Sequence, residues 1–164
     1  MSLAIVPGSF DPMTLGHLDI VKTVAKRYDR VVVAVMINRA KKYCFDMETR
    51  VRLAEATVSD LRNVRVIAET GMLIDLFDRL GADAVCKGWR NQKDFDYELH
   101  MADWNRAHNP SFRTELIYAK NRHLNVSSTL VRERLLADDG WEELLHPQAA
   151  QIIREMLENR GGKK

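Results

Sequence analysis

Short apolar runs alternate with longer amphipathic stretches along the chain. The runs are continuous instead of alternating with polar residues, which is typical of strands covered on both faces. The stretches between them have the length of helices and carry their apolar residues on one stripe. The predicted strands are Leu3–Val6, Val31–Ile37, Val64–Ile67, Ala84–Cys86 and Leu116–Ala119, and the predicted helices are His17–Tyr28, Glu48–Leu61, Leu73–Leu80 and Asp94–Arg106.

The order of these elements predicts an α/β fold. Strands that alternate with helices indicate a Rossmann-like, doubly wound, parallel five-stranded sheet with helices on both faces. Right-handed crossovers then bring the carboxyl ends of the strands to one edge. Residues 127–159 form a predicted helical C-terminal extension. It holds one helix after a run of hydroxyl residues, Ser127–Ala137, and a second, Gln148–Glu158, with Pro147 at its first position.

The whole chain, residues 1–164, is predicted to be a single domain. Its length fits one domain, and no repeat, low-complexity segment or linker interrupts it. The Gly- and Lys-rich tail Arg160–Lys164 is expected to fray.

Composition narrows the class of protein without identifying it. Hydrophobic residues make up 46% of the chain, charged residues 29%, and the net charge is +2. The bulk charge therefore gives no reason to expect a nucleic acid or a membrane as partner. Cys44 and Cys86 have no metal-ligand spacing and imply no disulfide framework, which favours a reducing compartment. The first apolar run is too short for a signal peptide or a membrane span, so we expect a soluble cytoplasmic protein.

The turn between the first strand and the first helix, Gly8–His17, carries the strongest chemical signal. Ligands of doubly wound sheets bind at such turns. Gly8 would let the backbone approach a phosphate, and Ser9 adds a hydroxyl donor. His17 lies in the first helical turn, where free N–H groups and the positive end of the helix dipole attract anions. The turn is neither the Gly-rich Rossmann fingerprint nor a Walker A sequence.

His17 itself has two interpretations. A lone histidine at a helix start is more often a cap, but the surrounding pattern favours an anion site. The helix start should lower the pKa of its imidazole, whereas a bound polyphosphate should raise it. Its expected role is to stabilise charge on phosphoryl oxygens, not to act as a nucleophile.

Three later segments add cations and hydroxyl donors. Lys41 and Lys42 follow the second strand, where a basic pair could reach phosphates or form an ordinary solvated loop. Lys87 and Arg90 end the fourth strand and suit a polyphosphate. The hydroxyl run Ser127–Thr129 fits phosphate binding at a helix start, an ordinary N-cap, or both.

Two of these motifs together resemble bacterial phosphopantetheine adenylyltransferases, of the T/HxGH type within the nucleotidyltransferase superfamily. The first is Pro7-Gly8-Ser9-Phe10-Asp11-Pro12 with Thr14-x-Gly16-His17-Leu18-Asp19-Ile20, and the second is Val126-Ser127-Ser128-Thr129-Leu130-Val131-Arg132. A third segment, Lys87-Gly88-Trp89-Arg90, stands where the family has Arg-Gly-Leu-Arg; the lysine keeps the charge and loses the bidentate geometry. The resemblance extends from about Leu3 to Leu157.

The resemblance implies an enzyme that transfers AMP from ATP to 4′-phosphopantetheine by direct in-line attack, giving dephospho-coenzyme A and pyrophosphate. It implies Mg²⁺, and because the sequence shows no carboxylate cluster for a metal, we expect the ion to be held by ATP and water, with Asp11 as a weak outer-shell candidate. It also implies a homohexamer and, as in some members, inhibition by coenzyme A.

The same resemblance assigns site residues. The implied catalytic residues are His17, Lys41 and Arg90. Those implied to bind phosphopantetheine are Ser9, Lys41, Leu73, Lys87 and Asn105. Those implied to bind ATP are Ser9, Phe10, His17, Gly88, Trp89, Arg90, Glu98, His123, Leu124, Asn125, Val126, Ser127, Ser128 and Thr129.

Two other functions fit parts of the pattern. A related nucleotidyltransferase could use another acceptor, such as nicotinamide mononucleotide or glycerol 3-phosphate. A non-catalytic nucleotide sensor could share the fold, but such a sensor need not retain a full set of donors for a transition state.

Overall fold

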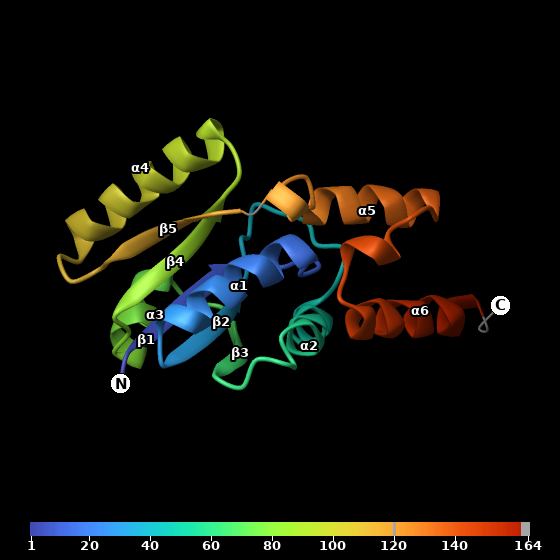
Figure 1. Cartoon of the computed structure of the whole chain (residues 1–164), viewed down its shortest axis with the longest axis horizontal. Coiled ribbons are helices and arrows are strands. Elements are labelled where there is room, and N and C mark those ends of the chain that lie inside the picture. Colours follow the sequence, from blue (N-terminus) through green and yellow to red (C-terminus); the bar gives the residue numbers. More distant parts are fainter. Residues whose placement is uncertain (120, 162–164) are drawn as a thin grey trace.

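The protein is described here by a computed structural model, which covers residues 1–119 and 121–161. Its centre is one five-stranded sheet in which all neighbouring strands are parallel (Figure 1). The order of the strands is β3-β2-β1-β4-β5. The strands are β1 (Leu3–Gly8), β2 (Arg30–Met36), β3 (Val64–Glu69), β4 (Ala84–Trp89) and β5 (Thr114–Tyr118). The predicted doubly wound α/β fold is confirmed.

Within residues 1–119 and 121–161, six α-helices alternate with or follow the strands. They are α1 (Leu15–Arg27), α2 (Met47–Thr57), α3 (Leu73–Leu80), α4 (Gln92–His108), α5 (Ser128–Ala137) and α6 (Pro147–Gly161). Short polar side chains cap the starts of α2, α4 and α5. Asp46 accepts the Thr49 N–H at 2.8 Å, Asn91 accepts the Asp94 N–H at 2.9 Å, and Ser127 accepts the Leu130 N–H at 3.1 Å.

Both faces of the sheet are buried, which explains the continuous apolar runs. Neighbouring side chains of a strand point to opposite faces. Ala4 and Val6 of β1 therefore join the core cluster of α1 and α2, whereas Ile5 joins the cluster that contains Leu76 and Phe77 of α3.

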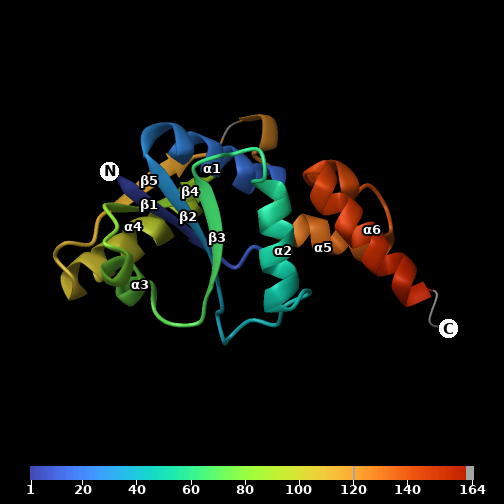
Figure 2. The ribbon, with the colours of Figure 1, turned by 90° about the horizontal axis from the view of Figure 1, so that it is seen from below.

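The C-terminal extension forms a third apolar cluster. α6 lies beside α2, and α5 continues from the carboxyl edge of the sheet (Figures 1 and 2). A short 3₁₀ helix, η2 (Glu142–Leu144), joins α5 to α6, and another, η1 (Asn121–His123), precedes α5. Trp141 and Ile153 pack in this cluster with Phe45 and Leu53 from the first half of the chain.

Several boundaries differ from the prediction. β4 continues through Trp89 instead of ending at Cys86, because the end of a parallel strand at the ligand-binding edge needs no apolar cover. α2 ends at Thr57 instead of Leu61. Arg160 belongs to α6, whereas residues 162–164 of the expected tail lie outside the described residues. Among the described helices, none combines the length and the apolar character that crossing a bilayer requires.

Candidate active site

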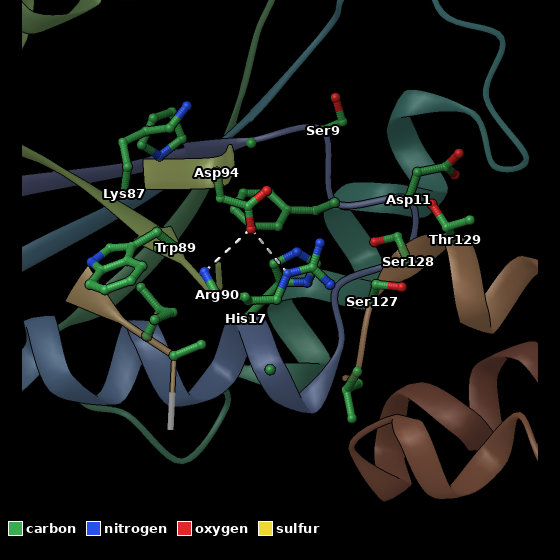
Figure 3. Close-up of a pocket in the computed structure, with 18 of the residues that line it drawn as sticks. Ser9, Asp11, His17, Lys87, Trp89, Arg90, Asp94, Ser127, Ser128 and Thr129 are labelled. Atoms are coloured by element: carbon green, nitrogen blue, oxygen red, sulfur yellow. Dashed lines mark hydrogen bonds and ion pairs between the residues drawn. The ribbon is translucent and has the colours of Figure 1, made fainter. Parts of the chain in front are cut away.

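A large cavity opens at the carboxyl edge of the sheet, where the strand order reverses between β1 and β4. This is the usual ligand site of such sheets. Its volume is about 810 Å³. Most of the predicted site residues line it: Ser9, Phe10, His17, Lys41, Lys87, Gly88, Trp89, Arg90, Glu98, His123, Val126, Ser127, Ser128 and Thr129. In Figure 3, Lys87 and Trp89 lie on one side and Ser127–Thr129 on the other, with His17 and Arg90 between them.

His17 is fixed by a reciprocal cap at the start of α1. Its backbone N–H donates to the Thr14 hydroxyl at 3.3 Å, and the Thr14 N–H donates to its Nδ1 at 3.0 Å. Since Nδ1 is an acceptor, the neutral imidazole carries its proton on Nε2. His17 is therefore both a cap and a donor that can face the cavity, so the two interpretations of this residue are compatible.

The protonation state of His17 follows from its surroundings. Burial, and then the positive charge of Arg90, lower the pKa of His17 to about 4. The pKa is lowered, as the helix start also predicts, and the causes found in the structure are burial and Arg90. The imidazole is neutral at pH 7 and presents a donor without a charge.

Close packing explains two glycines of the first turn. A Cβ on Gly16 would lie 3.0 Å from the carbonyl oxygen of Val126, so this glycine lets the segment before α5 approach α1. A Cβ on Gly8 would lie 2.8 Å from the ring of Phe10. The space beside Gly8, expected for a phosphate, is thus taken by the Phe10 ring, which also meets His17 edge-on at 5.2 Å between ring centroids.

The two cations at the end of β4 are paired with carboxylates of α4. Lys87 Nζ lies 3.3 Å from Glu98 Oε2. The Nε and the backbone N–H of Arg90 each donate to Asp94 Oδ2 at 3.3 Å, as the dashed lines in Figure 3 indicate. Arg90 precedes α4, so both pairs join the end of β4 to a carboxylate of α4. Side chains at this wall therefore carry both signs of charge.

The start of α5 is fastened to the first turn. The Ser128 hydroxyl donates to the Pro12 carbonyl at 2.8 Å, and Arg132 donates to the Asp11 carbonyl at 2.8 Å. Ser127 caps the helix. The hydroxyl run thus serves as a cap and as a wall of the cavity at once, as its sequence allowed. Arg132 braces the first turn as well as its own helix.

Asp11 has a different role from the outer-shell metal contact considered above. Its two carboxylate oxygens accept the backbone N–H groups of Cys44 and Phe45 at 2.8 and 2.9 Å. The residue is 3% exposed. Within the described residues, no group of three or more His, Cys, Asp or Glu side chains is arranged to hold a metal ion.

Four predicted site residues lie outside the cavity wall. Leu73, the first residue of α3, and Leu124 pack against core clusters. Asn105 is the buried residue of α4, and Asn125 is exposed. The fold brings the other predicted residues together and leaves these four at its margins.

Sequence reasoning missed two residues that shape the site. Arg50 of α2 is 2% exposed and binds backbone carbonyls, including that of Ser9 at 2.8 Å. Asp19 pairs with His123, which ties η1 to α1. The position of Arg50, a charged residue on the apolar stripe of a helix, could have indicated its role. Nothing in the sequence indicated that Asp19 would pair with the distant His123.

Comparisons with known proteins show which proteins this chain resembles. The model of the cytidylyltransferase-like family matches residues 5–134. A phosphopantetheine adenylyltransferase of Latilactobacillus sakei is 39% identical over 96% of this chain and 96% of its own. One of Limosilactobacillus reuteri is 42% identical over 98% of this chain and 92% of its own.

A solved structure supports the fold. It is described as a nicotinate-nucleotide adenylyltransferase from Vibrio parahaemolyticus and superposes with a TM-score of 0.67 at 16% identity, covering 93% of this chain and 98% of that one. The near-complete matches to curated relatives carry the assignment further: the chain is a nucleotidyltransferase enzyme and belongs to the phosphopantetheine adenylyltransferase family.

Proposed function

We propose that the enzyme transfers AMP from ATP to 4′-phosphopantetheine, giving dephospho-coenzyme A and pyrophosphate in coenzyme A biosynthesis. The observation that carries the proposal is the neutral, Nε2-protonated His17 in a cavity that Lys41 and the start of α5 also line. Direct transfer between two phosphates needs donors in this arrangement more than it needs a nucleophile.

In the proposed reaction an oxygen of the acceptor phosphate attacks the α-phosphorus of ATP. A bond forms between this oxygen and the α-phosphorus, while the bond to the bridging oxygen of the β-phosphate breaks and pyrophosphate leaves. The attacking phosphate is already ionised, so no strong general base is required. His17 would donate from Nε2 to an α-phosphate oxygen, and Lys41 and Arg90 would add positive charge.

On the ATP side, the proposed contacts are Ser9, Phe10, Gly88, Trp89, Glu98 and residues 123–129. Mg²⁺ would arrive bound to the triphosphate and neutralise its charge. The side chains near the cavity offer it no carboxylate cluster, and the Asp11 oxygens already accept two N–H groups. The ion would therefore be held by phosphate and water oxygens.

On the acceptor side, Ser9, Lys41 and Lys87 would contact the phosphate of phosphopantetheine. Leu73 and Asn105 would contact its extended arm outside the cavity. Lys87 Nζ lies 3.3 Å from Glu98 Oε2, so the charge of Lys87 would have to be shared between Glu98 and the acceptor phosphate.

A comparison of acceptors tests the proposal. Pyrophosphate release from ATP and Mg²⁺ would be measured with 4′-phosphopantetheine, nicotinamide mononucleotide and glycerol 3-phosphate in parallel. We expect release with the first acceptor alone. Release confined to either of the other two would refute the assigned substrate, and ATP binding without release from any acceptor would indicate a sensor.

We also propose a cytoplasmic homohexamer that binds coenzyme A as a feedback inhibitor, as the family resemblance implies. α4 supports an assembly, because Asn105 is the one buried residue among its 17 and Tyr97, Leu99 and Trp104 are 61%, 46% and 41% exposed. Sedimentation equilibrium would give the oligomeric state. Initial rates at increasing coenzyme A would test the inhibition.

A further inference from the structure

The loop between β2 and α2, residues 37–46, carries Lys41 over the cavity. Its residues 37–42 are exposed, and it contains no helix or strand. An exposed loop of this kind does not by itself hold a lysine in one place. The far end of the loop is nevertheless fixed by two buried charged residues from other parts of the chain, Asp11 and Arg50.

Asp11 holds the loop by accepting hydrogen bonds from the loop's backbone N–H groups. Its carboxylate accepts the Cys44 N–H at Oδ2, at 2.8 Å, and the Phe45 N–H at Oδ1, at 2.9 Å. Both oxygens are therefore used on successive residues of the loop. In Figure 3 this carboxylate points away from His17, so it acts on the loop instead of on the reacting atoms.

Arg50 holds the same loop by donating hydrogen bonds to backbone carbonyls. Its Nε donates to the Phe45 carbonyl at 3.2 Å, and its Nη1 donates to the carbonyls of Ser9 and Met36 at 2.8 and 3.0 Å. Among the described residues, none of the carboxylates forms an ion pair with this guanidinium. Its forked geometry instead joins the end of β2, the first turn and the loop at one point.

Tyr43 closes the arrangement from the exposed side. Its ring covers the Arg50 guanidinium at 3.9 Å, and its hydroxyl accepts the Asn38 N–H at 2.6 Å. The hydroxyl also lies 3.4 Å from the Ser9 hydroxyl. Contacts thus flank Lys41 in sequence, at Asn38 before it and at Tyr43–Phe45 after it.

We propose that Asp11 and Arg50 are positioning residues that clamp the 37–46 loop to the first turn and so set the place of Lys41 relative to Ser9 and His17. The clamp rests on the proposed function in one respect: Lys41 must contact the acceptor phosphate. It predicts that loosening the loop weakens use of the acceptor far more than use of ATP.

The test uses the full-length protein and the variants Asp11→Asn and Arg50→Lys. Asp11→Asn replaces one acceptor oxygen by a donor, and Arg50→Lys keeps the charge but cannot reach all three carbonyls with one ammonium group. We expect amide hydrogen exchange at Cys44 and Phe45 to become about tenfold faster. The KM for phosphopantetheine should rise about tenfold, while the KM for ATP changes by less than about twofold.

Two further variants provide a milder test of the clamp and a control. Tyr43→Phe keeps the ring over Arg50 and removes only the hydroxyl. We expect both the amide exchange rate at Cys44 and Phe45 and the KM for phosphopantetheine to rise about threefold. This variant tests the clamp even if Asp11→Asn or Arg50→Lys fails to fold. Arg52→Lys, at an exposed position of the same helix, should change neither quantity.

The outcomes separate the clamp from the proposed function. Unchanged exchange and unchanged acceptor KM in the folded variants would overturn the clamp, and so would an equal rise in both KM values. Lys41→Ala serves as the independent check of the acceptor site. If it leaves the acceptor KM unchanged, the proposed role of Lys41 fails, whereas faster exchange in the clamp variants would still support the fixing of the loop.

Discussion

Among single residues, His17 combines a structural and a chemical task. The same hydrogen bond that completes the cap of α1 also decides which imidazole nitrogen carries the proton. Burial keeps that imidazole neutral. A donor held in this way needs no reorganisation when charge develops on a phosphoryl oxygen, which is the main condition for electrostatic catalysis.

His17→Ala is expected to lower the turnover of the enzyme about 10²- to 10³-fold, the usual loss for one charge-stabilising donor. Pyrophosphate release under saturating substrates measures it. His17→Gln is the matched variant for stability, because a glutamine at this position can keep the reciprocal cap that alanine loses. Turnover within threefold of the unmodified enzyme in folded His17→Ala would exclude the proposed role.

The lowered pKa of His17 also predicts a dependence of stability on pH. The ordinary value is 6.5 and the folded value is about 4, so between these pH values the unfolded chain binds the extra proton. The free energy of unfolding should therefore fall as the pH falls from about 6.5 to about 4, and His17 should add no slope above this range.

Urea unfolding at several pH values would measure this slope in the unmodified protein and in His17→Gln. The difference between the two proteins should grow only below about pH 6.5. A constant difference from pH 4 to pH 8 would contradict the assigned pKa.

Among the secondary-structure elements, α1 and the segment 123–127 depend on one close approach. Gly16 has no Cβ, and the carbonyl oxygens of Val126 and His123 would lie 3.0 and 3.4 Å from one. The same segment is the proposed ATP-binding wall. Backbone cannot yield as the end of a flexible side chain can, so an added methyl group must displace the segment.

Gly16→Ala is accordingly expected to cost about 1–3 kcal/mol of stability, the usual range for overpacking, and to raise the KM for ATP more than that for the acceptor. Chemical unfolding and steady-state rates measure the two effects. Gly71→Ala is the control, because a Cβ there would have its nearest neighbour at an ordinary 3.6 Å. Equal stability and equal KM for ATP in the two variants would show that the close contact between residue 16 and Val126 affects neither.

In the whole molecule, the C-terminal extension shares an apolar cluster with the first half of the chain. Its apolar cluster includes Phe45 from the 37–46 loop and Leu53 from α2, together with Val131 of α5. The cluster therefore joins the 37–46 loop and α2 to α5. This arrangement favours the predicted single domain.

Ile153→Ala tests this at the scale of the molecule. The side chain is 1% exposed, so its truncation should leave a cavity and cost about 2–5 kcal/mol. We expect one cooperative transition at a lower midpoint, monitored by circular dichroism during thermal unfolding. A separate early transition of the extension, with the rest unchanged, would contradict the single domain. Leu136→Ala, at a position 92% exposed, is the control.

The sequence by itself determined the elements and the chemistry of this protein. Continuous apolar runs exist because both faces of a parallel sheet are covered, and capping residues such as Asp46 and Ser127 act within a few residues of their own positions. Such local causes are readable from the chain. Motifs with a fixed spacing, such as Thr14-x-Gly16-His17, were readable for the same reason.

Only the tertiary structure decided which of those residues share a cavity and which partners they have there. It paired Lys87 with Glu98, gave both oxygens of Asp11 to the 37–46 loop, and brought Arg50 to the carbonyl of Ser9, 41 positions away. It also left Leu73 and Asn105 outside the cavity wall. These contacts join segments distant in sequence, so their existence depends on strand order and on packing, which no local pattern records.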